Sequence, residues 1–513
     1  MNGEWRLSTY DTILPLVNDP TRAVAVNGLY GAVDIITAEE SRLLEQSGGQ
    51  AALPSSLREE TATRLSLRGH LVRESPAWEL ENARILSRVH WLIPYRKFVD
   101  LVVMPTYNCN FRCEYCFERN RLDRGPEWLN RSMSPQMVDA LFDAVAGLQK
   151  RGGVVRRVIL YGGEPLLRAN QALVADLLRR CGEMGIHIAA VTNGYDLDHF
   201  LDVFPQEVTD FLQITVDGPA PVHDSRRYLA GGQGTFARIM DNIGKALDHH
   251  LHINVRTNVN RANLRDGLSL MDEYRRRGFI GNPYFSFYFK ATLGCYEEDP
   301  ANAITDEDVF QALLGAGVDR KEAIRLSRVH SFMAQFASSA LDRTQYPLLK
   351  PSFCGAHSDM LVVDPDGTLY ACWDMVSMEE HAVGFLDPES KRFLYNFNFA
   401  KWRNRTAEQL PDCAQCPLMM VCGGGCAVEA EALHGDRNRG YCGSMKEAFR
   451  EVIPQLCEER FASTGDLALS NSFYDLFRAL TPEERHFLLT SSDSEQVWHL
   501  IRRHLTAADK IFA

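Results

Sequence analysis

The sequence has no apolar run that approaches the roughly 18 residues needed by a membrane-spanning helix. It also lacks a basic start followed by an apolar stretch, so we expect no secretory signal. Positive charge is in deficit, because 55 Lys and Arg oppose 67 Asp and Glu and the formal net charge is −12. Phosphate binding needs clustered Lys and Arg. These absences predict a cytoplasmic protein without a membrane or nucleic-acid partner.

Internal repeats and low-complexity segments are also absent, and 513 residues are too many for one hydrophobic core. We therefore expect two to four domains. The residue patterns divide the chain into a small mixed module, an alternating strand–helix region, a bridging helix, a cysteine-rich region and a helical extension. In chain order these five regions span 1–95, 96–325, 326–350, 351–460 and 461–513. In the last of them, Thr481-Pro482-Glu483-Glu484 has the capping-box form that predicts a helix start.

The first module, residues 1–95, mixes short strands with helices. A capping-box pattern at Thr37 to Glu40 predicts a helix start, and a second helix is expected from about Ser55 to Leu67. Strands mixed with short helices predict a winged-helix-like module.

From about residue 98, apolar strand patterns alternate with helical patterns, which predicts an α/β fold with a parallel sheet covered by helices. Six such units are too few for a full eight-fold barrel, so we expect a partial (β/α)6 barrel. The six predicted strands are 98–106, 154–162, 186–194, 211–218, 252–259 and 283–292.

Thirteen cysteines are many for a protein of a reducing compartment, where clusters of Cys indicate metal or redox sites more than disulfides. Cys109, Cys113 and Cys116 directly follow the first predicted barrel strand. Three thiolates this close can hold a [4Fe–4S] cluster by three of its irons and leave the fourth open. A structural or zinc site is the alternative, although no fourth ligand lies nearby. The isolated Cys181, Cys295 and Cys457 are expected to be packing residues.

A second cysteine group lies in the cysteine-rich region, and seven thiolates exceed what one four-coordinate centre can use. At least two centres are therefore expected, with zinc ribbons as the alternative. Asp364-Pro365-Asp366-Gly367 predicts a hairpin turn that brings the first two of these cysteines together. The seven are Cys354, Cys372, Cys413, Cys416, Cys422, Cys426 and Cys442.

Polar and glycine residues follow the predicted strands at their carboxyl ends, where folds of this kind place ligands. Gly162 and Gly163 allow close backbone approach to a ligand, and Glu164, which precedes Pro165, can accept a hydrogen bond from an ammonium group. A tight strand-to-helix turn without a ligand is the alternative. Further candidates at the next three strands are Thr192, Asn193, Thr215, Asp217, Arg256 and Asn258.

The first cysteine triplet, with the aromatic Tyr115 before its last Cys, resembles the signature of the radical S-adenosylmethionine (SAM) superfamily. The resemblance implies that the open iron is chelated by SAM. It also implies that an electron from the cluster cleaves SAM to a 5′-deoxyadenosyl radical, which abstracts hydrogen from the substrate. The Gly162 to Pro165 segment resembles the family's GGE motif, which holds the methionyl amine of SAM. In relatives, positions similar to the candidates at the ends of the next three strands line the SAM pocket.

The second cysteine group resembles the SPASM extension of radical SAM enzymes, including the glycine at Gly367. The resemblance implies two auxiliary [4Fe–4S] clusters, and thus three clusters in all. It assigns Cys413, Cys416, Cys422 and Cys442 to the outer cluster, and Cys354, Cys372 and Cys426 to the inner one.

Two positions depart from this pattern. Leu348 stands where some relatives carry a further cysteine, so the inner cluster has an open iron or a distant ligand such as Cys295. Trp373 stands where the sulfatase-maturing branch has an acidic residue, and Asp374, our further catalytic candidate, comes one residue later.

Three functions compete for this sequence. We expect a peptide maturase that modifies, for example by a cross-link, a ribosomally made precursor, with the first module reading its leader by strand addition at a sheet edge. The alternatives are an anaerobic sulfatase-maturing enzyme and a non-catalytic iron–sulfur electron carrier or scaffold. The expected partners are the precursor peptide and a reductant such as flavodoxin or ferredoxin.

Overall fold

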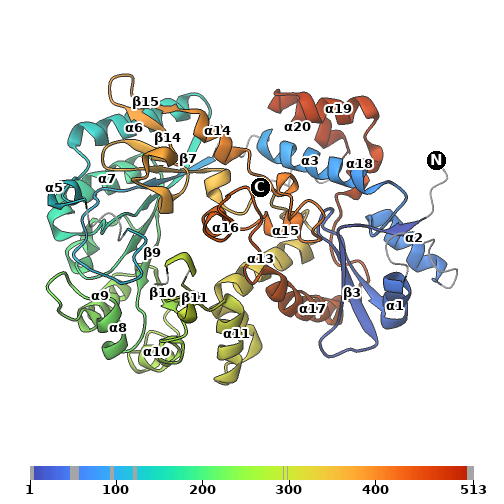
Figure 1. The fold of residues 1–513 in the computed structure, drawn as a ribbon, viewed down its shortest axis with the longest axis horizontal. Helices are drawn as coiled ribbons and strands as arrows, with labels where there is room; N and C mark the ends of the chain where they lie inside the picture. Colours follow the sequence, from blue (N-terminus) through green and yellow to red (C-terminus); the bar gives the residue numbers. More distant parts are fainter. Residues whose placement is uncertain are drawn as a thin grey trace. The chain divides into compact units, whose positions relative to one another are not determined.

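The computed structural model describes residues 5–46, 57–92, 98–118, 124–292, 294–296 and 299–504. The chain forms two compact units that interleave along the sequence (Figure 1). The cysteine-rich region predicted over 351–460 contributes to both units. The first unit consists of Met1–Arg96, Val329–Cys354 and Arg405–Ala513, and the second of Lys97–Arg328 and Gly355–Asn404. Within the described ranges, no helix is both long and apolar enough to cross a membrane.

A ten-stranded sheet runs through the second unit in the order β11-β10-β9-β8-β7-β6-β12-β13-β14-β15. Strands β6 to β11 pair in parallel with their sequence neighbours, which confirms the expected α/β fold with six parallel strands. Their bounds are β6 (Phe98–Val103), β7 (Val154–Leu160), β8 (His187–Thr192), β9 (Thr209–Thr215), β10 (Ile253–Val259) and β11 (Phe285–Ala291).

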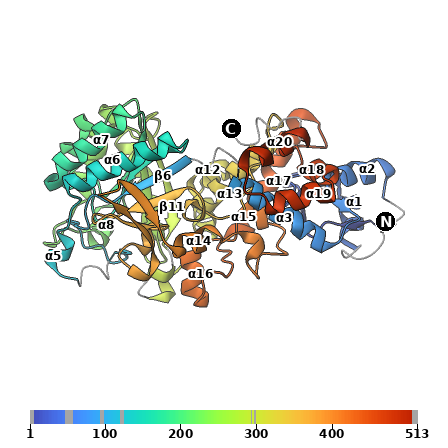
Figure 2. The same cartoon turned by 90° about the horizontal axis from the view of Figure 1, so that it is seen from above.

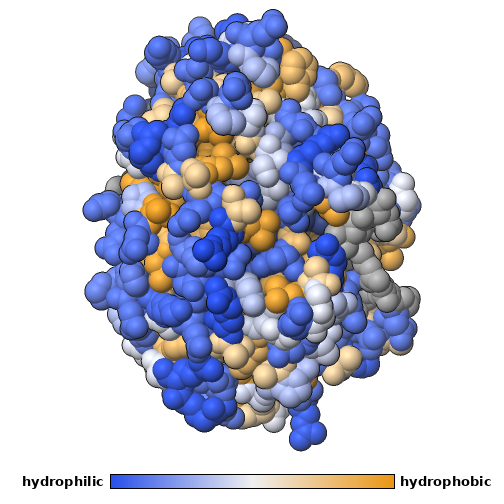
Figure 3. Space-filling view, turned by 90° about the vertical axis from the view of Figure 1, so that its left-hand side faces the viewer, coloured by the Kyte–Doolittle hydropathy of each residue, from blue (hydrophilic) through white to orange (hydrophobic). Residues whose placement is uncertain are grey.

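Amphipathic helices connect these parallel strands. The Ser134 side chain caps α6 (Pro135–Lys150) by accepting a hydrogen bond from the backbone N–H of Met137, and Pro135 opens the helix. Figure 3 shows one face of the molecule, where hydrophilic residues predominate and hydrophobic residues form scattered patches. The helices are α5 (Pro126–Leu129), α6 (Pro135–Lys150), α7 (Gln171–Glu183), α8 (Ala220–Arg226), α9 (Phe236–Asp248), α10 (Leu264–Arg276), α11 (Asp306–Gly315) and α12 (Arg320–Leu326).

The other side of β6 continues the sheet with residues from the cysteine-rich region. β12 (Met360–Val363) pairs in parallel with β6, and β13 (Thr368–Tyr370) returns antiparallel to it. Gly367, with φ of +85°, closes the turn by donating its N–H to Asp364 O at 3.0 Å. The hairpin predicted from this segment is thereby confirmed. β14 (Ala382–Asp387), β15 (Arg392–Tyr395) and α14 (Phe397–Arg403) complete this part.

The first unit contains the antiparallel sheet β2-β3-β4. A capping box formed by Thr37 and Glu40 starts the helix after β4, as predicted. Leu44 and Leu65 of the first two helices pack with Ala25 of β3 in a hydrophobic core. In this module the strands β2 to β4 precede the helices in the chain. The similarity of the module to a winged-helix domain stays a prediction. The bounds are β1 (Arg6–Leu7), β2 (Asp11–Pro15), β3 (Arg22–Asn27), β4 (Val33–Thr37), α1 (Ala38–Gln46), α2 (Glu59–Arg68), β5 (Leu71–Val72) and α3 (Pro76–Leu92).

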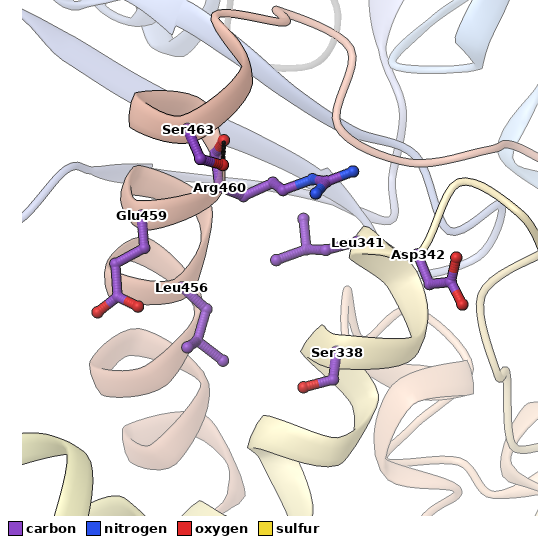
Figure 4. Close-up of a pocket in the computed structure, with 7 residues that line it drawn as sticks. All are labelled: Ser338, Leu341, Asp342, Leu456, Glu459, Arg460 and Ser463. Carbon is purple, nitrogen blue, oxygen red and sulfur yellow. Dashed lines mark hydrogen bonds between the residues drawn. The ribbon is translucent and has the colours of Figure 1, made fainter.

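Helices from the later parts of the chain complete the first unit. α19 and α20 pack against α3 (Figures 1 and 2), and the capping box predicted at Thr481 is confirmed. A shallow groove separates α13 from α17 (Figure 4), and none of its lining residues belongs to a chemical motif of the sequence. The helices are α13 (Arg328–Leu341), α15 (Met419–Cys422), α16 (Ala427–His434), α17 (Met445–Thr464), α18 (Tyr474–Ala479), α19 (Pro482–Thr490) and α20 (Ser494–His504).

A fully buried histidine joins two carboxylates beneath the small sheet. His70 contacts Asp11 through Nδ1 at 2.5 Å and Asp34 through Nε2 at 2.9 Å. Burial lowers the pKa of His70, but the two carboxylates outweigh it and raise the pKa to about 9. Arg68 also donates to Asp34. The network is therefore a paired, charged element of the core of the first unit.

Candidate active site and cysteine loops

The first cysteine triplet lies in the loop after β6, at its carboxyl end. The backbone N–H of Phe111 donates to Cys109 Sγ at 3.4 Å, and that of Cys116 donates to Cys113 O at 3.3 Å. Burial raises the pKa of the Cys109 thiol, and the charges of Glu164, Cys113 and Cys116 raise it further. The three sulfurs thus lie close enough to interact, in surroundings that disfavour thiolates without a cation.

Three thiolates in one loop match the ligands that a [4Fe–4S] cluster requires when one iron is left open. Among the residues that the structure describes, no three His, Cys, Asp or Glu side chains converge on one metal-ion position. A [4Fe–4S] cluster binds each thiolate through a different iron, so its ligands lie farther apart than those of one zinc ion.

The Gly162 to Pro165 turn is packed tightly against the cysteine loop. A Cβ atom on Gly163 would lie only 2.3 Å from the backbone oxygen of Asn108 and 2.4 Å from that of Tyr107. Glu164 donates its N–H to Asn108 O at 2.7 Å, and its side chain is 2% exposed. Only glycine permits this approach, which places the Glu164 carboxyl group beside the triplet.

Residues at the end of β8 hold the Glu164 carboxyl group. It accepts hydrogen bonds from the Thr192 hydroxyl at 2.5 Å, the Asn193 N–H at 2.6 Å and the Leu166 N–H at 2.9 Å. Burial nevertheless raises the pKa of Glu164 to about 7. Thr192 and Asn193, predicted to line the same pocket, do adjoin Glu164.

A second network joins the cysteine loop to β9 and β10. The Tyr115 hydroxyl donates to Asp217, and it accepts from Arg227 at 2.7 Å and from Asn258 at 3.2 Å. Arg256 donates to the side chain of Asn258 at 2.7 Å. Four of the predicted residues therefore meet in one hydrogen-bonded group.

Two residues of this group were not predicted. Arg227 is buried, and His223 accepts from the N–H of Asp217 at 3.2 Å through Nδ1. Burial lowers the pKa of His223 well below its usual range. Neither residue belongs to a motif, and only their positions within α8 and directly after it, following the fourth strand, could have singled them out. Thr215 lies opposite Arg256 in the β9–β10 register.

Asp374 belongs to the second unit and lies near Tyr161, the residue before the Gly162 to Pro165 turn. Trp373 stacks on Tyr161 with ring centroids 5.3 Å apart, and Tyr161 directly precedes Gly162. The pKa of Tyr161 is raised chiefly by burial and then by the charge of Asp374. Cys372 donates to Asp374 at 3.6 Å. Asp374 is thus near the Gly162 to Pro165 turn, although it follows the predicted auxiliary ligand Cys372.

Six of the seven later cysteines belong to the first unit, and four of them interact with one another. Burial raises the pKa of Cys413 to about 11, and the charges of Cys416 and Cys442 contribute. Burial likewise raises the pKa of Cys422 to about 12, with contributions from the same neighbours. This is the set that the resemblance to the SPASM extension assigns to the outer cluster.

The isolated cysteines differ from one another. Cys181 and Cys457 are buried, as expected of packing residues. For Cys295 that prediction was wrong, because its side chain is exposed in a short turn after the end of β11. Leu348, at the departure from the cysteine pattern, is 52% exposed.

Comparison with known proteins agrees with this geometry. Residues 103–266 match the family model of the radical SAM superfamily. The cysteine-type anaerobic sulfatase-maturating enzyme of Clostridium novyi (strain NT) is 22% identical over 379 residues, which cover 70% of this chain and 96% of that protein. The serine-type anaerobic sulfatase-maturating enzyme of Klebsiella aerogenes is 22% identical over 355 residues, 68% of this chain and 83% of that protein.

A solved structure shares the fold. Native anSMEcpe with bound AdoMet and Cp18Cys peptide matches with a TM-score of 0.54 and 18% identity, over 71% of this chain and 99% of that one. The family match implies SAM and a [4Fe–4S] cluster. This chain therefore contains a radical SAM domain and is related to the anaerobic sulfatase-maturating enzymes.

Proposed function

We propose that this protein is a radical SAM peptide maturase that modifies a ribosomally synthesised precursor peptide by forming a cross-link. The observation that carries the proposal is the meeting of Cys109, Cys113 and Cys116 with the buried Glu164 at the carboxyl ends of parallel strands. The N-terminal module adds no cysteine to this site, which favours a role in binding. A non-catalytic electron carrier leaves the Glu164 turn without a purpose.

The residues present fit the cofactors of this chemistry. Cys109, Cys113 and Cys116 would hold the cluster, and Glu164 would accept a hydrogen bond from the SAM amine. When bound, the cluster and SAM supply the electron and the radical that takes a hydrogen atom from the peptide. The chain's own contribution is to fix the cysteine loop through the Tyr115 hydroxyl and to keep the Glu164 carboxyl group shielded from water.

One edge of the small sheet in the first unit is already paired. Ile35 donates its N–H to Leu467 O at 2.7 Å, and Leu469 donates to Val33 O at 2.8 Å. Val33 in turn donates its N–H to the Ser470 hydroxyl at 2.8 Å. A leader peptide could therefore add to β4 only by displacing residues of this chain.

The other edge, β2, is the one we propose for the leader peptide. The N–H of Leu16 donates to Arg22 O at 3.2 Å, so even-numbered residues of this strand face β3. The N–H and C=O of Ile13 consequently point away from the sheet. Pro15 has no N–H, which limits the edge to a short pairing segment. Strand addition here would supply modest affinity, and tethering raises the effective concentration of the reacting segment.

The alternative function is sulfatase maturation, which the named relatives favour. It would use Asp374 as an acidic group near the SAM site, where its charge acts on Tyr161. Trp373 occupies the place at which the sulfatase-maturing branch carries its acidic residue, and it stacks on Tyr161 instead.

The partners follow from the chemistry. Reductive SAM cleavage consumes an electron, so we propose a reductant such as flavodoxin or ferredoxin. Thiolate-ligated clusters and such a reductant belong to a reducing compartment, which supports a cytoplasmic location.

Product analysis distinguishes the two functions. The reconstituted, reduced enzyme is incubated separately with a peptide encoded beside its gene and with a sulfatase-derived peptide, and the products are identified by mass spectrometry. We expect only the first peptide to react, with loss of a pair of hydrogens. Formylglycine in the sulfatase peptide, with no change in the other, would establish the alternative.

Iron analysis tests the cofactors independently of the substrate. Three [4Fe–4S] clusters require about 12 irons per chain, and replacing Cys109, Cys113 and Cys116 with Ala should remove about four of them. About four irons in the intact protein would mean that the later cysteines bind something else, such as zinc.

A further inference from the structure

A single buried arginine lies among the cysteine loops of the first unit. Arg405 is 3% exposed and donates hydrogen bonds only to backbone carbonyl oxygens in the contacts that the structure gives it. Its Nε donates to Arg437 O at 2.6 Å, its Nη1 to Gly425 O at 2.9 Å and its Nη2 to Arg439 O at 2.9 Å. The guanidinium group thereby ties together the two loops that flank α16.

Each of these loops leads directly to predicted cluster ligands. Gly425 precedes Cys426, and Arg439 lies three residues before Cys442. Gly425 has a φ of +76°, and a Cβ atom there would lie 1.7 Å from Tyr441 O. The loops therefore approach each other as closely as their backbones permit. Arg405 holds them together there through its hydrogen bonds to Gly425 O and Arg439 O.

The same guanidinium group is within electrostatic reach of ligands assigned to both auxiliary clusters. Burial lowers the pKa of Arg405, and the charges of four cysteines oppose this effect. Cys426 and Cys354 belong to the inner set, whereas Cys413 and Cys422 belong to the outer set. The carbonyl groups around Arg405 neutralise none of its charge, so the thiolate sites experience a fixed cation.

Such a cation has a predictable effect on a cluster. A [4Fe–4S] cluster with thiolate ligands is negatively charged, and reduction adds one more negative charge. A nearby positive charge stabilises the reduced state more than the oxidised state, with little screening in a buried site. Net charge and hydrogen bonding are the means by which proteins set cluster potentials.

We propose that Arg405 is a positioning residue shared by both auxiliary clusters, and that its charge raises their reduction potentials. This inference rests on the proposed function, because that function requires the auxiliary clusters. The inference also gives a reason for the buried charge. One side chain sets the reduction potentials of both clusters, so that both can accept an electron released when the peptide is oxidised.

The test uses a chain in which Cys109, Cys113 and Cys116 are Ala, so that only the auxiliary clusters contribute to the spectra. Arg405→Gln removes the charge, and Arg405→Lys keeps it while losing the forked hydrogen bonds. Arg437→Gln is the matched control, because it removes one positive charge from a side chain of the same loop that pairs with Glu431. Iron content and the midpoint potentials, followed by electron paramagnetic resonance during a redox titration, are measured for each.

We expect Arg405→Gln to shift the midpoints to more negative values, while Arg405→Lys and Arg437→Gln remain near the parent. Unchanged midpoints in an iron-loaded Arg405→Gln chain overturn the inference. If Arg405→Gln does not load iron, Arg405→Lys decides: parent-like midpoints support the inference, whereas shifted midpoints or absent iron show that the charge has no such role. Absence of iron from the parent itself overturns the auxiliary clusters of the proposed function as well.

Discussion

The residues around Glu164, which we propose as the SAM site, and the later cysteine loops are held in different ways. Around Glu164, the polar groups extend from the ends of neighbouring parallel strands and bond to one another. Around Arg405, the cysteines lie on loops and short helices, joined by a single side chain and by glycine backbones. We therefore expect the sheet to organise the first site without a cofactor, and the second region to depend on its cluster for much of its order.

Removal of iron should therefore affect the two regions unequally. We expect residues 411–443 to lose hydrogen-exchange protection by orders of magnitude in the chelated protein, while strands β6 to β11 keep theirs. The measurement is hydrogen exchange with mass spectrometry on iron-loaded and chelated protein. Equal loss of protection in residues 411–443 and in strands β6 to β11 would show that the two regions do not differ in their dependence on iron.

The Glu164 carboxyl group is the part of the sheet-built site that should matter most for SAM. Glu164→Gln keeps the shape but removes the charge, and we expect SAM affinity to fall about 10- to 100-fold. Glu183→Gln, at an exposed residue paired with Arg179, is the control. Equilibrium dialysis with labelled SAM measures both, and equal affinities would exclude Glu164 from amine binding.

The same group predicts a pH dependence. Burial raises the pKa of Glu164 to about 7, so the carboxyl group becomes protonated below that pH. Since the ionised form accepts the ammonium group, SAM affinity should decline by up to about tenfold per pH unit below about 7. The Glu164→Gln variant should show no such decline.

The sheet edge in the first unit offers a comparison of its own. Ile13→Pro removes an N–H that points away from β3, so the sheet should keep its pairing. We expect modification of the precursor to decrease about tenfold while SAM cleavage without peptide remains unchanged. Deleting residues 1–90 is a poorer test, because β4 is paired with Leu467 and Leu469 and the deletion would expose them. Full peptide modification by the Pro variant would refute docking at this edge.

The last prediction from this comparison concerns the stability of the first unit, through its charged core. The pKa of His70 is raised from 6.5 to about 9, so protonated His70 stabilises the fold fully below pH 6.5 and loses this contribution as pH rises through about 9. His70→Gln should lower the free energy of unfolding by about 1–3 kcal/mol at pH 7, with little effect at pH 10. Urea unfolding followed by hydrogen exchange in β4 measures this. His187→Gln, at an exposed histidine of the second unit, should leave β4 unchanged.

Local patterns in the sequence were reliable where local chemistry decides the structure. Capping residues at Thr37 and Thr481, the turn at Gly367 and the six parallel strands were all predicted correctly. These features depend on residues within a few positions of one another, so short-range patterns contain the information.

Features that depend on distant segments were missed. The pairing of β12 with β6 and of Leu467 with Ile35 joins segments hundreds of residues apart, and neither leaves a short-range pattern. Arg405 and Arg227 look like ordinary surface arginines in the sequence, and only the folded chain shows that they are buried. The exposure of Cys295 was missed because the usual burial of cysteine was given more weight than the turn signal of the adjacent Gly294.

The central claim is that the cysteines of the loop after β6 hold the cluster used for SAM cleavage. Measuring SAM cleavage tests this claim most directly. Cys113→Ala is compared with Cys181→Ala, which alters a buried packing cysteine of α7. Both proteins are reconstituted anaerobically and reduced, and 5′-deoxyadenosine is quantified. We predict that Cys113→Ala produces none while keeping its other iron, and that Cys181→Ala matches the parent. Normal 5′-deoxyadenosine production by Cys113→Ala would contradict the account.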